Sequence, residues 1–597
     1  MRLTQRLFFF FLLSFFQNAI AQPIPAERTV DWTAAGLTEA KPDPAVELDV
    51  TLQGIVPENM LDNDLRLNNL IGNWEGGQLV LFFPPGTYYF RGTVRLKDQI
   101  ILKGASSEST IFQFQNNDGG DLFDISGTLS GQTTSLLADA LRGKINLEVA
   151  DVSFFQEGDY LELTQNGQAL ATSSWAMSSV GQILKIVAIE GNQLIVNQAL
   201  RKYFLLSENP IVKKMIPVQD VGIECLKIER LDLTENQTSN ISFQYAANCW
   251  VSGVESANCN FAHLAISNST NILVEGSFFH DAFDYGNGGK AYGVALQFTS
   301  GECLIENNVF DHLRHSVLLQ AGSNGNVVAY NYSTNPFWTG VNLPTNSAGD
   351  LVLHGNYPFA NLFEGNICQN IVLDDSHGIN GPFNTFFRNR AESFGIFMAN
   401  TQPSDSQNFV GNVVSNSAFP LAIGLFILAG TDQFSFGNYM NNSVLPSGTE
   451  SLVDSSLYLR APPGFLLPNQ SLSLIGLPNG VNTAFNPAKE RFVNSSAKTN
   501  CGGEALTAVN ELTKVFNPKI FPNPIAEEPL FFEISEEFFT QTGLEVAIYN
   551  VGGILVFKSK LKASKESLDV SDLPKGVYFL QFRRDGQILA NRKLVRE

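Results

Sequence analysis

Imidazole side chains gather in one stretch of this sequence. All six histidines fall between positions 263 and 377, and the rest of the chain has none. Histidine exchanges protons near neutral pH, so a confined set of histidines points to acid–base chemistry. Two of them, His354 and His377, are each followed by glycine and each precede an asparagine by twelve residues. The alternative is that these histidines are structural residues, stacked on one another and tied by hydrogen bonds.

A repeated phrase around asparagine runs through and beyond the same stretch. Short runs of Val, Ile, Leu or Phe accompany an asparagine at steps of 23, 35, 23, 23 and 26 residues. The six positions are Asn308, Asn331, Asn366, Asn389, Asn412 and Asn438. A nearly fixed step of this length indicates a solenoid of stacked coils. The repeats lack helical periodicity, which favours strands, and asparagine tolerates the left-handed backbone of a tight corner. The pattern therefore predicts an all-β fold, a right-handed parallel β-helix.

Aligning the coils on these asparagines brings reactive side chains together. His315 and Asp350 fall in one column, sixteen residues before their asparagines, and His354 and His377 fall in another. Asp375 stands two residues before His377, so both take the same side of a strand. We therefore expect three successive coils to present His315, Asp350, His354, Asp375 and His377 on one outward face, as candidate catalytic residues.

Two kinds of glycan cleavage fit this set of side chains. Glycoside hydrolases use a pair of carboxylates, which here would be Asp350 and Asp375, oriented by the histidines. Of the adjacent Asp374 and Asp375, only one can face the groove, because neighbours in a strand point to opposite sides. A lyase instead needs a base of tuned pKa, here His315 or His354, and a cation to neutralise the uronate carboxylate. Both reactions stay open.

Residues for binding are expected on the loops and coils beside this face. Guanidinium groups would hold a carboxylate, and aromatic rings would stack on the apolar faces of sugars. The candidates for substrate binding are Arg314, Arg388, Trp338 and Tyr285. Calcium takes carboxylate oxygens as ligands, and the candidate ligands are Asp281, Asp284 and Asp311. Ca²⁺ is the one cofactor considered, and the sequence does not require it.

Composition excludes several classes of binding partner. The formal net charge of −20 argues against nucleic acid and anionic membranes. Residues 1–21 contain two arginines, an apolar run and an Ala-Ile-Ala end, which is typical of a cleaved signal peptide. This run is too short to span a membrane, and no other transmembrane segment is expected. Six cysteines lack CxxC spacing, so no zinc site is predicted. We expect a monomer.

The domain organisation follows from where the repeat is clear and where it is interrupted. Alternating apolar residues in the interruption predict a small β subdomain, a wall of the groove. The expected order is a signal peptide (1–21), the first β-helix coils (22–127), an inserted β subdomain (128–217), coils with the active groove and a terminal cap (218–500), a linker (501–516) and a C-terminal module (517–597).

Two segments resemble known families. The run LVLFFPPGTYYFRGTVRLKDQIILKGASSESTIF, from position 79, resembles the first coils of the pectate-lyase-like superfamily. The PNP opening at 522–524, YNVGG at 549–553 and LPKGVYFLQF at 573–582 closely resemble the C-terminal sorting domain of the type IX secretion system. That resemblance implies a β-sandwich, contact with the type IX machinery, and export through the periplasm and outer membrane of a Bacteroidota-type bacterium. The protein would be secreted or held at the cell surface.

Two functions from different classes follow. The first is an exported enzyme, a glycoside hydrolase or polysaccharide lyase, that degrades pectin-like or other plant or algal glycans. The second is a non-catalytic surface β-helix that serves as an adhesin or glycan-binding protein. A polysaccharide is the expected partner in both. The two differ in whether the histidines and aspartates converge on an open face.

Overall fold

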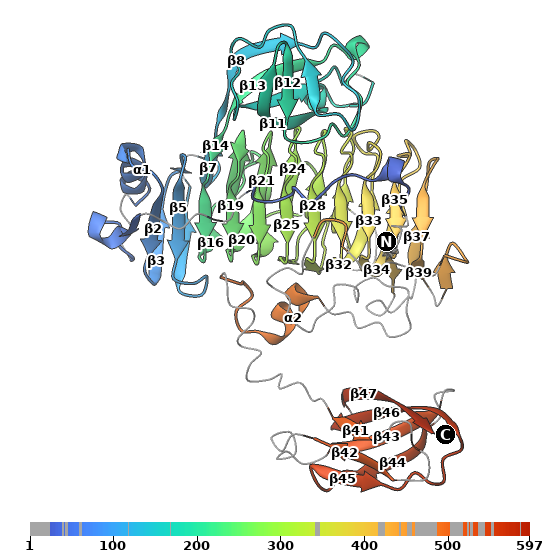
Figure 1. Cartoon of the computed structure of the whole chain (residues 1–597). Coiled ribbons are helices and arrows are strands. Elements are labelled where there is room, and N and C mark those ends of the chain that lie inside the picture. The colour runs from blue at the N-terminus through green and yellow to red at the C-terminus, as the bar shows by residue number, and fades with distance from the viewer. Residues whose placement is uncertain are drawn as a thin grey trace, which may run out of the picture. The chain divides into compact units, whose positions relative to one another are not determined.

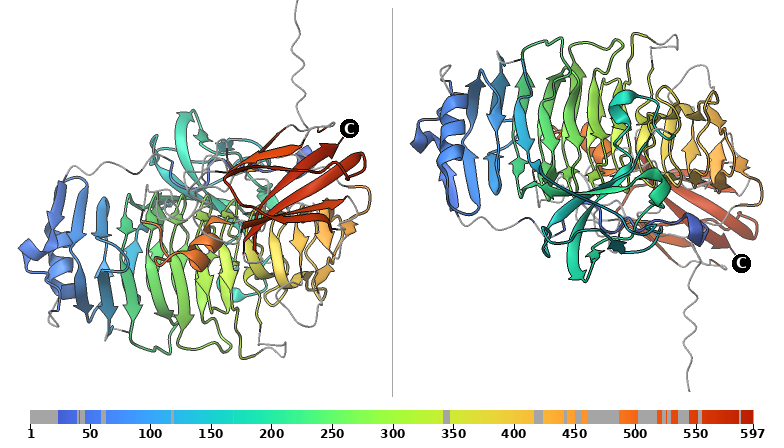
Figure 2. Two further views of the ribbon diagram at one scale, coloured as in Figure 1. Left: turned by 90° about the horizontal axis from the view of Figure 1, so that it is seen from below. Right: turned by 90° about the horizontal axis from the view of Figure 1, so that it is seen from above.

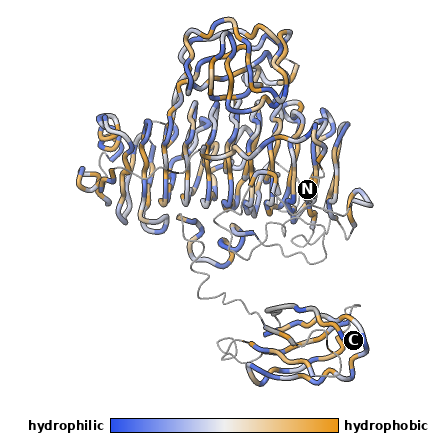
Figure 3. The backbone as a smooth tube through the Cα atoms, in the orientation of Figure 1, coloured by the Kyte–Doolittle hydropathy of each residue, from blue (hydrophilic) through white to orange (hydrophobic). Residues whose placement is uncertain are grey.

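Most coils of the chain are built from three short parallel strands. One coil runs through β22 (Leu273–Glu275), β23 (Phe278–Ala282) and β24 (Tyr292–Gln297). The next coil repeats the order with β25 (Leu304–Glu306), β26 (Val309–Asp311) and β27 (His315–Leu319), and each strand pairs with its counterpart in the coil before. Apolar residues alternate along these strands, so one side of every coil faces a common core (Figure 1 and Figure 3).

This computed structural model contains two large parallel sheets. One has twelve strands, in the order β1 (Val46–Asp49), β2 (Leu79–Phe83), β5 (Ile100–Gly104), β15 (Gly222–Glu224), β19 (Trp250–Ser252), β22, β25, β28 (Val327–Ala329), β31 (Leu362–Glu364), β33 (Thr385–Phe387), β35 (Asn408–Val410) and β38 (Phe434–Phe436). The other has twenty strands and forms two faces, because in most coils the second and third strands pair in separate runs. The long strands β32 (Ile367–Leu373) and β34 (Arg390–Met398) take part in both runs. The structure describes residues 24–38, 41, 46–58, 63–116, 119–167, 169–340, 347–415, 424–440, 443–449, 456–459, 486–501, 518–521, 525, 529–534, 544–550, 555–584 and 587–596. The expected signal peptide and nearly all of the expected linker lie outside these residues.

Asparagine ladders tie successive coils together. The amide nitrogens of Asn308, Asn331, Asn366, Asn389 and Asn412 each donate to the side-chain oxygen of the next asparagine, at 2.8–3.1 Å. All six members of this ladder are buried. The left-handed corner was expected at the asparagines themselves, and this expectation is wrong. The residue before each asparagine takes that backbone, so the asparagine side chain points inward to its ladder partner. The predicted column of asparagines is confirmed.

A helix and two extended segments cover the coils. Helix α1 (Asn63–Asn73) lies over the first coils and contributes Leu67 and Ile71 to the core. Residues 24–38, the N-terminal strap, run along the coils against the direction of the solenoid (Figure 2). Arg28 bonds to Asn408 and Asp432 near the last coils, whereas the peptide group of Gly36 reaches Glu302 and Asn271. The C-terminal strap, residues 486–501, includes α2 (Pro487–Asn494).

The inserted subdomain is a separate antiparallel sheet with its own core. Its strands are β8 (Thr128–Ser135), β13 (Ile211–Ile216), β10 (Tyr160–Thr164), β11 (Gly181–Glu190), β12 (Gln193–Val196) and β9 (Asn146–Glu148), in that order. Leu161, Leu184 and Val212 are buried in this core. The subdomain stands on the coils, as Figure 1 shows. Its loop between β10 and β11 reaches down to the coils, where the backbone of Thr172 and Ser173 donates to Asn356.

The C-terminal residues form a second compact unit, 506–597. One sheet contains β41 (Lys519–Phe521), β42 (Leu530–Glu533) and β45 (Lys565–Leu568), and the other contains β44 (Leu555–Lys560), β43 (Leu544–Asn550), β46 (Gly576–Arg584) and β47 (Gln587–Arg596). Phe532 from the first sheet and Phe582 from the second pack in one core. The predicted β-sandwich is therefore confirmed, as is the all-β parallel β-helix before it.

Candidate active site

Three consecutive coils bring a histidine and an aspartate into direct contact. Leu319 of β27, Leu353 of β30 (Leu351–Leu353) and Leu373 of β32 (Ile367–Leu373) pair in register and point into the core. The residues after the last two, His354 and Asp374, therefore follow on neighbouring coils. The His354 Nδ1 atom lies 2.5 Å from Asp374 Oδ2. This carboxylate–imidazole pair is the centre of the candidate site.

Two further imidazoles flank this pair. The ring centroid of His354 lies 5.0 Å from that of His377 and 6.0 Å from that of His315. The turn that contains His377 packs closely against Gly355. A Cβ at Gly355 would lie 2.6 Å from the carbonyl carbon of His377, and the φ of Gly355 is +73°, so this contact requires glycine. The ring of His315 in turn stacks on Tyr292, with centroids 5.1 Å apart. The four rings of His377, His354, His315 and Tyr292 thus form a line across successive coils.

Burial and neighbouring charge set the protonation of this line. Burial lowers the pKa of His315 to about 3, and the charges of Arg314 and His354 add to this. Burial, with the nearby His354, also lowers the pKa of His377. Burial would raise the pKa of Asp374, but its hydrogen bond and charge interaction with His354 outweigh this, and the pKa is lowered. Near neutral pH, Asp374 is therefore ionised and His315 is a neutral imidazole.

Hydrogen bonds fix which nitrogen of His315 can accept a proton. The Nδ1 atom of His315 lies 2.8 Å from the carbonyl oxygen of Gly349. A carbonyl oxygen only accepts, so Nδ1 carries the hydrogen and Nε2 has the lone pair. The Nδ1 atom of His377 lies 3.1 Å from the hydroxyl of Ser173, which either donates or accepts. The inserted subdomain thus contributes a polar contact to the site.

Trp175 of the inserted subdomain borders the site, and the sequence analysis missed it. It lies in the short helix η3 (Ser174–Ala176), its ring is 5.8 Å from His377, and 47% of the residue is exposed. An exposed tryptophan beside an imidazole is suited to stack on a sugar ring. The sequence predicted that the subdomain forms a wall of the groove. Trp175 is the one tryptophan in residues 128–217, and it could have indicated which part of that wall borders the site.

Asp350 does not lie beside the imidazoles, although the sequence predicted it there. The register of β27 and β30 sets Val317 opposite Leu351, an offset of 351 − 317 = 34 residues, whereas the predicted column had 350 − 315 = 35. Leu351 and Leu353 point into the core as expected, but Asp350 comes before β30, so strand alternation does not set its direction. The Asp350 carboxylate is fully buried, where it accepts hydrogen bonds from Ser333 and from the backbone of Asn370. Burial raises its pKa to about 7.

Asp375 also lies away from the imidazoles. Its carboxylate accepts a hydrogen bond from the backbone of Gln402 at 2.7 Å. The sequence analysis recognised that only one of Asp374 and Asp375 could face the groove. The structure brings Asp374, not Asp375, to His354, because β32 ends at Leu373 and the next residue still follows the strand register.

The candidate binding residues fall into two groups. Trp338 covers the Arg314 guanidinium at 4.5 Å, and Arg314 also approaches Tyr292, so this pair adjoins the line of imidazoles. The hydroxyl of Tyr285 accepts from the backbone of Ala282 and holds its loop. Arg388 is buried, follows a strand of the twelve-stranded sheet and interacts with Glu364, so it does not belong to the site.

The proposed calcium ligands have other partners. Asp281 bonds to His280 and His312 at 2.9 Å, and Asp284 forms an ion pair with Lys290. Asp311 accepts a hydrogen bond from Asn335. In the described part of the chain, no three His, Cys, Asp or Glu side chains are grouped so that they would hold a metal ion. The structure thus does not bring the three aspartates together.

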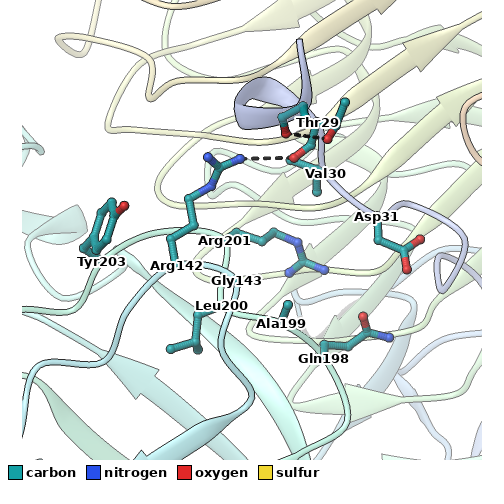
Figure 4. Close-up of a pocket in the computed structure, with 11 residues that line it drawn as sticks. Thr29, Val30, Asp31, Arg142, Gly143, Gln198, Ala199, Leu200, Arg201 and Tyr203 are labelled. Carbon is teal, nitrogen blue, oxygen red and sulfur yellow. Dashed lines mark hydrogen bonds between the residues drawn. The ribbon is translucent and has the colours of Figure 1, made fainter. Parts of the chain in front are cut away.

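A cavity of about 270 Å³ lies elsewhere, between the N-terminal strap and the inserted subdomain (Figure 4). Arg142 points across it and donates to backbone oxygens of Glu27 and Thr29. Arg201 is buried, with Glu302 and Asn324 as partners. The cations of this cavity therefore hold the strap and the subdomain against the coils. None of the imidazoles lines it, so it is a seam of the fold rather than part of the candidate site.

Comparison with known families agrees with this architecture. Residues 217–365 match the family described as right handed beta helix region, and residues 519–597 match the secretion system C-terminal sorting domain. The chain is a right-handed β-helix protein with a C-terminal sorting domain. The sorting domain directs this β-helix protein to the type IX secretion machinery, and so to the cell surface or the medium. No helix among its described residues has the length and apolar character needed to span a membrane.

Individual relatives of the β-helix protein are distant. A capsule K1-specific depolymerase of Klebsiella phage K64-1 is 23% identical over 201 residues, which are 32% of this chain and 22% of the depolymerase. The tailspike protein gp49 of Pseudomonas phage LKA1 is 12% identical, with a TM-score of 0.41, over 63% of this chain and 74% of the tailspike. The gp54 tailspike of Acinetobacter baumannii phage AP22, solved with capsular saccharide, is 13% identical, with a TM-score of 0.35. The match covers 67% of this chain and 77% of the tailspike.

Proposed function

We propose that this protein is an exported polysaccharide lyase that cleaves a uronate-containing glycan by β-elimination. The hydrogen bond between His354 and Asp374, flanked by His315 and His377, carries the proposal. A carboxylate that accepts from one imidazole nitrogen leaves the other nitrogen basic and fixes its direction. The site therefore has what proton removal beside a carboxylate needs, a base held in one orientation.

The count of carboxylates favours elimination over hydrolysis. A glycoside hydrolase needs two carboxyl groups about 5–9.5 Å apart, one on each side of the bond. Among the described residues of the site, Asp374 is the carboxylate that contacts an imidazole, and it is already engaged with His354. Asp350 is buried under the sheet and Asp375 is bonded to the backbone of Gln402. Neither supplies the second carboxyl group at this position.

The reaction assigns a role to each side chain. His354, oriented by Asp374, takes the proton from C5 of the uronate, next to the carboxylate. The electron pair forms the C4–C5 double bond, the C4–O bond breaks, and the leaving oxygen takes a proton from Tyr292 or from water. Arg314 would neutralise the uronate carboxylate, because its guanidinium lies 5.8 Å from the ring of Tyr292, which stacks on His315. Trp175 and Trp338 would stack on sugar rings on either side.

The biological setting is part of the same proposal. The sorting domain is typical of Bacteroidota-type bacteria, whose exported enzymes meet plant, algal or microbial polysaccharides outside the cell. The name of the capsule depolymerase relative supports a polymeric glycan as the substrate, and pectin-like chains are the first to test. We further propose that the β-helix acts as a monomer and that the sorting domain is removed after export.

Product analysis tests this proposal directly. The purified chain is incubated with pectate, alginate, glycosaminoglycans and bacterial capsules, with and without EDTA, while absorbance is followed at roughly 235 nm, where the unsaturated product absorbs. We expect absorbance from at least one uronate, and its loss in the His354→Ala variant. New reducing ends without this absorbance would refute elimination and indicate a hydrolase. Binding without any cleavage, unchanged in His354→Ala, would indicate an adhesin.

A further inference from the structure

From β15 onward, the corner that follows each strand of the twelve-stranded sheet has a left-handed backbone. The first four of these corners are formed by Cys225 (φ +55°), Gly253 (+64°), Gly276 (+60°) and Asn307 (+54°), and later ones include Tyr330 and Arg388. Glycine and asparagine accept this conformation readily, whereas other residues are strained in it. Backbone preference therefore does not explain the cysteine at this corner.

The C-terminal strap follows this column of corners from coil to coil. The Arg491 guanidinium donates to the side chain of Asn307, and the backbone nitrogen of Asn500 donates to the carbonyl oxygen of Gly276 at 2.7 Å. One coil further, a Cβ on Gly253 would lie 2.9 Å from the Cα of Cys501. The strap thus moves one corner toward the start of the solenoid with each contact, and it reaches Cys225 at Cys501.

The side chains of Cys225 and Cys501 meet at the same corner. The Sγ atom of Cys501 lies 3.6 Å from the carbonyl oxygen of Gly253, and the backbone nitrogen of Cys225 donates to the neighbouring carbonyl oxygen of Ser252 at 3.0 Å. Each thiol affects the pKa of the other. Both residues keep some exposure, 8% for Cys225, and Cys501 is half-buried. The four remaining cysteines, Cys249, Cys259, Cys303 and Cys368, are completely buried among apolar residues. The pair is therefore distinct from them in position and accessibility.

We propose that Cys225 and Cys501 form a disulfide bond after export. Two S–H bonds break and one S–S bond forms, while two electrons and two protons pass to the disulfide of a thiol oxidoreductase outside the cytoplasm. The bond joins the last described residue of the strap to a coil near the start of the solenoid. It fastens the strap just before the segment that leads to the sorting domain, so removal of that domain leaves the strap in place.

Thiol counting on the exported, full-length chain tests this proposal. The protein is collected from an oxidising compartment, denatured without reductant, alkylated and weighed as an intact chain. We expect four alkylated cysteines before reduction and six after reduction, and a peptide that joins Cys225 to Cys501 in a non-reducing digest. Six alkylated cysteines before reduction, or a linked peptide with any other pairing, would overturn the proposal.

Single variants supply a matched control. Cys501→Ser removes one partner and should leave five alkylated cysteines, because Cys225 is then free. Cys368→Ser removes a cysteine outside the pair and should leave three. In limited proteolysis, Cys501→Ser should release the C-terminal strap faster than the wild type, and a reductant should bring the wild type to the same rate. Equal release from oxidised wild type and Cys501→Ser would contradict the fastening role.

Discussion

Replacing Asp374 by Asn tests how the carboxylate contributes to the chemistry. The substitution keeps the shape of the side chain but removes the charge that His354 contacts at 2.5 Å. The two side chains are 21% and 11% exposed, so solvent screens their interaction little. A hydrogen bond with one charged partner contributes about 1.5–3 kcal/mol. If this is realised in the transition state, kcat should fall about 10- to 150-fold, with little change in KM.

The neighbouring residue provides the control for this substitution. Asp375 carries the same charge one position away, but its carboxylate bonds to the backbone of Gln402, which an asparagine oxygen can also accept. Initial rates at roughly 235 nm on the cleaved glycan, with a thermal unfolding curve for each variant, compare the two. We expect Asp375→Asn to retain the wild-type rate. Equal losses in the two variants, or full activity of Asp374→Asn, would refute the role given to Asp374.

Three further predictions concern the scaffold. Asn366→Leu should destabilise the chain by about 2–4 kcal/mol in urea unfolding, because it leaves buried ladder partners unpaired. Exposed Asn236→Ala should change stability by less than about 0.5 kcal/mol, because Asn236 is outside the ladder and has no left-handed backbone. Gly355→Ala should lower the activity and melting temperature, since its Cβ would meet the His377 backbone. Wild-type activity and melting temperature in this variant would show that the His377 turn can shift without cost. Burial raises the pKa of Glu306 from 4.5 to about 8, so the folded state holds a proton that the unfolded state loses. Stability should therefore fall from about pH 4.5 to pH 8, and Glu306→Gln should flatten that slope in denaturant titrations.

The repeat was enough to predict the solenoid because its signal is carried by many coils at once. The six asparagines of the ladder, and the apolar runs beside them, fixed the fold class and the approximate column of each histidine. His354 and His377 accordingly lie 5.0 Å apart. The β-sandwich was predictable for a different reason, since the motifs of the sorting domain are specific.

Single positions in the site were less predictable, because the count from an asparagine passes through turns of variable length. The coil between Asn331 and Asn366 is longer by twelve residues than its neighbours. The alignment was off by one residue in that coil. Asp350 also lies before the strand, where its carboxylate turns to buried partners instead of the outward face. Trp175 comes from a subdomain inserted far earlier in the chain, and only the fold shows which coil it meets.

The direction of the N-terminal strap constrains the order in which this protein reaches its final form. Its first described residues bind late coils, through Arg28 to Asn408 and Asp432 and through Trp32 to Ala360. A ribosome makes this strap hundreds of residues before it makes the surface that receives it. The strap must therefore wait, undocked, until nearly the whole solenoid exists. A chain cut short before the last coils would lose the anchor for its own beginning.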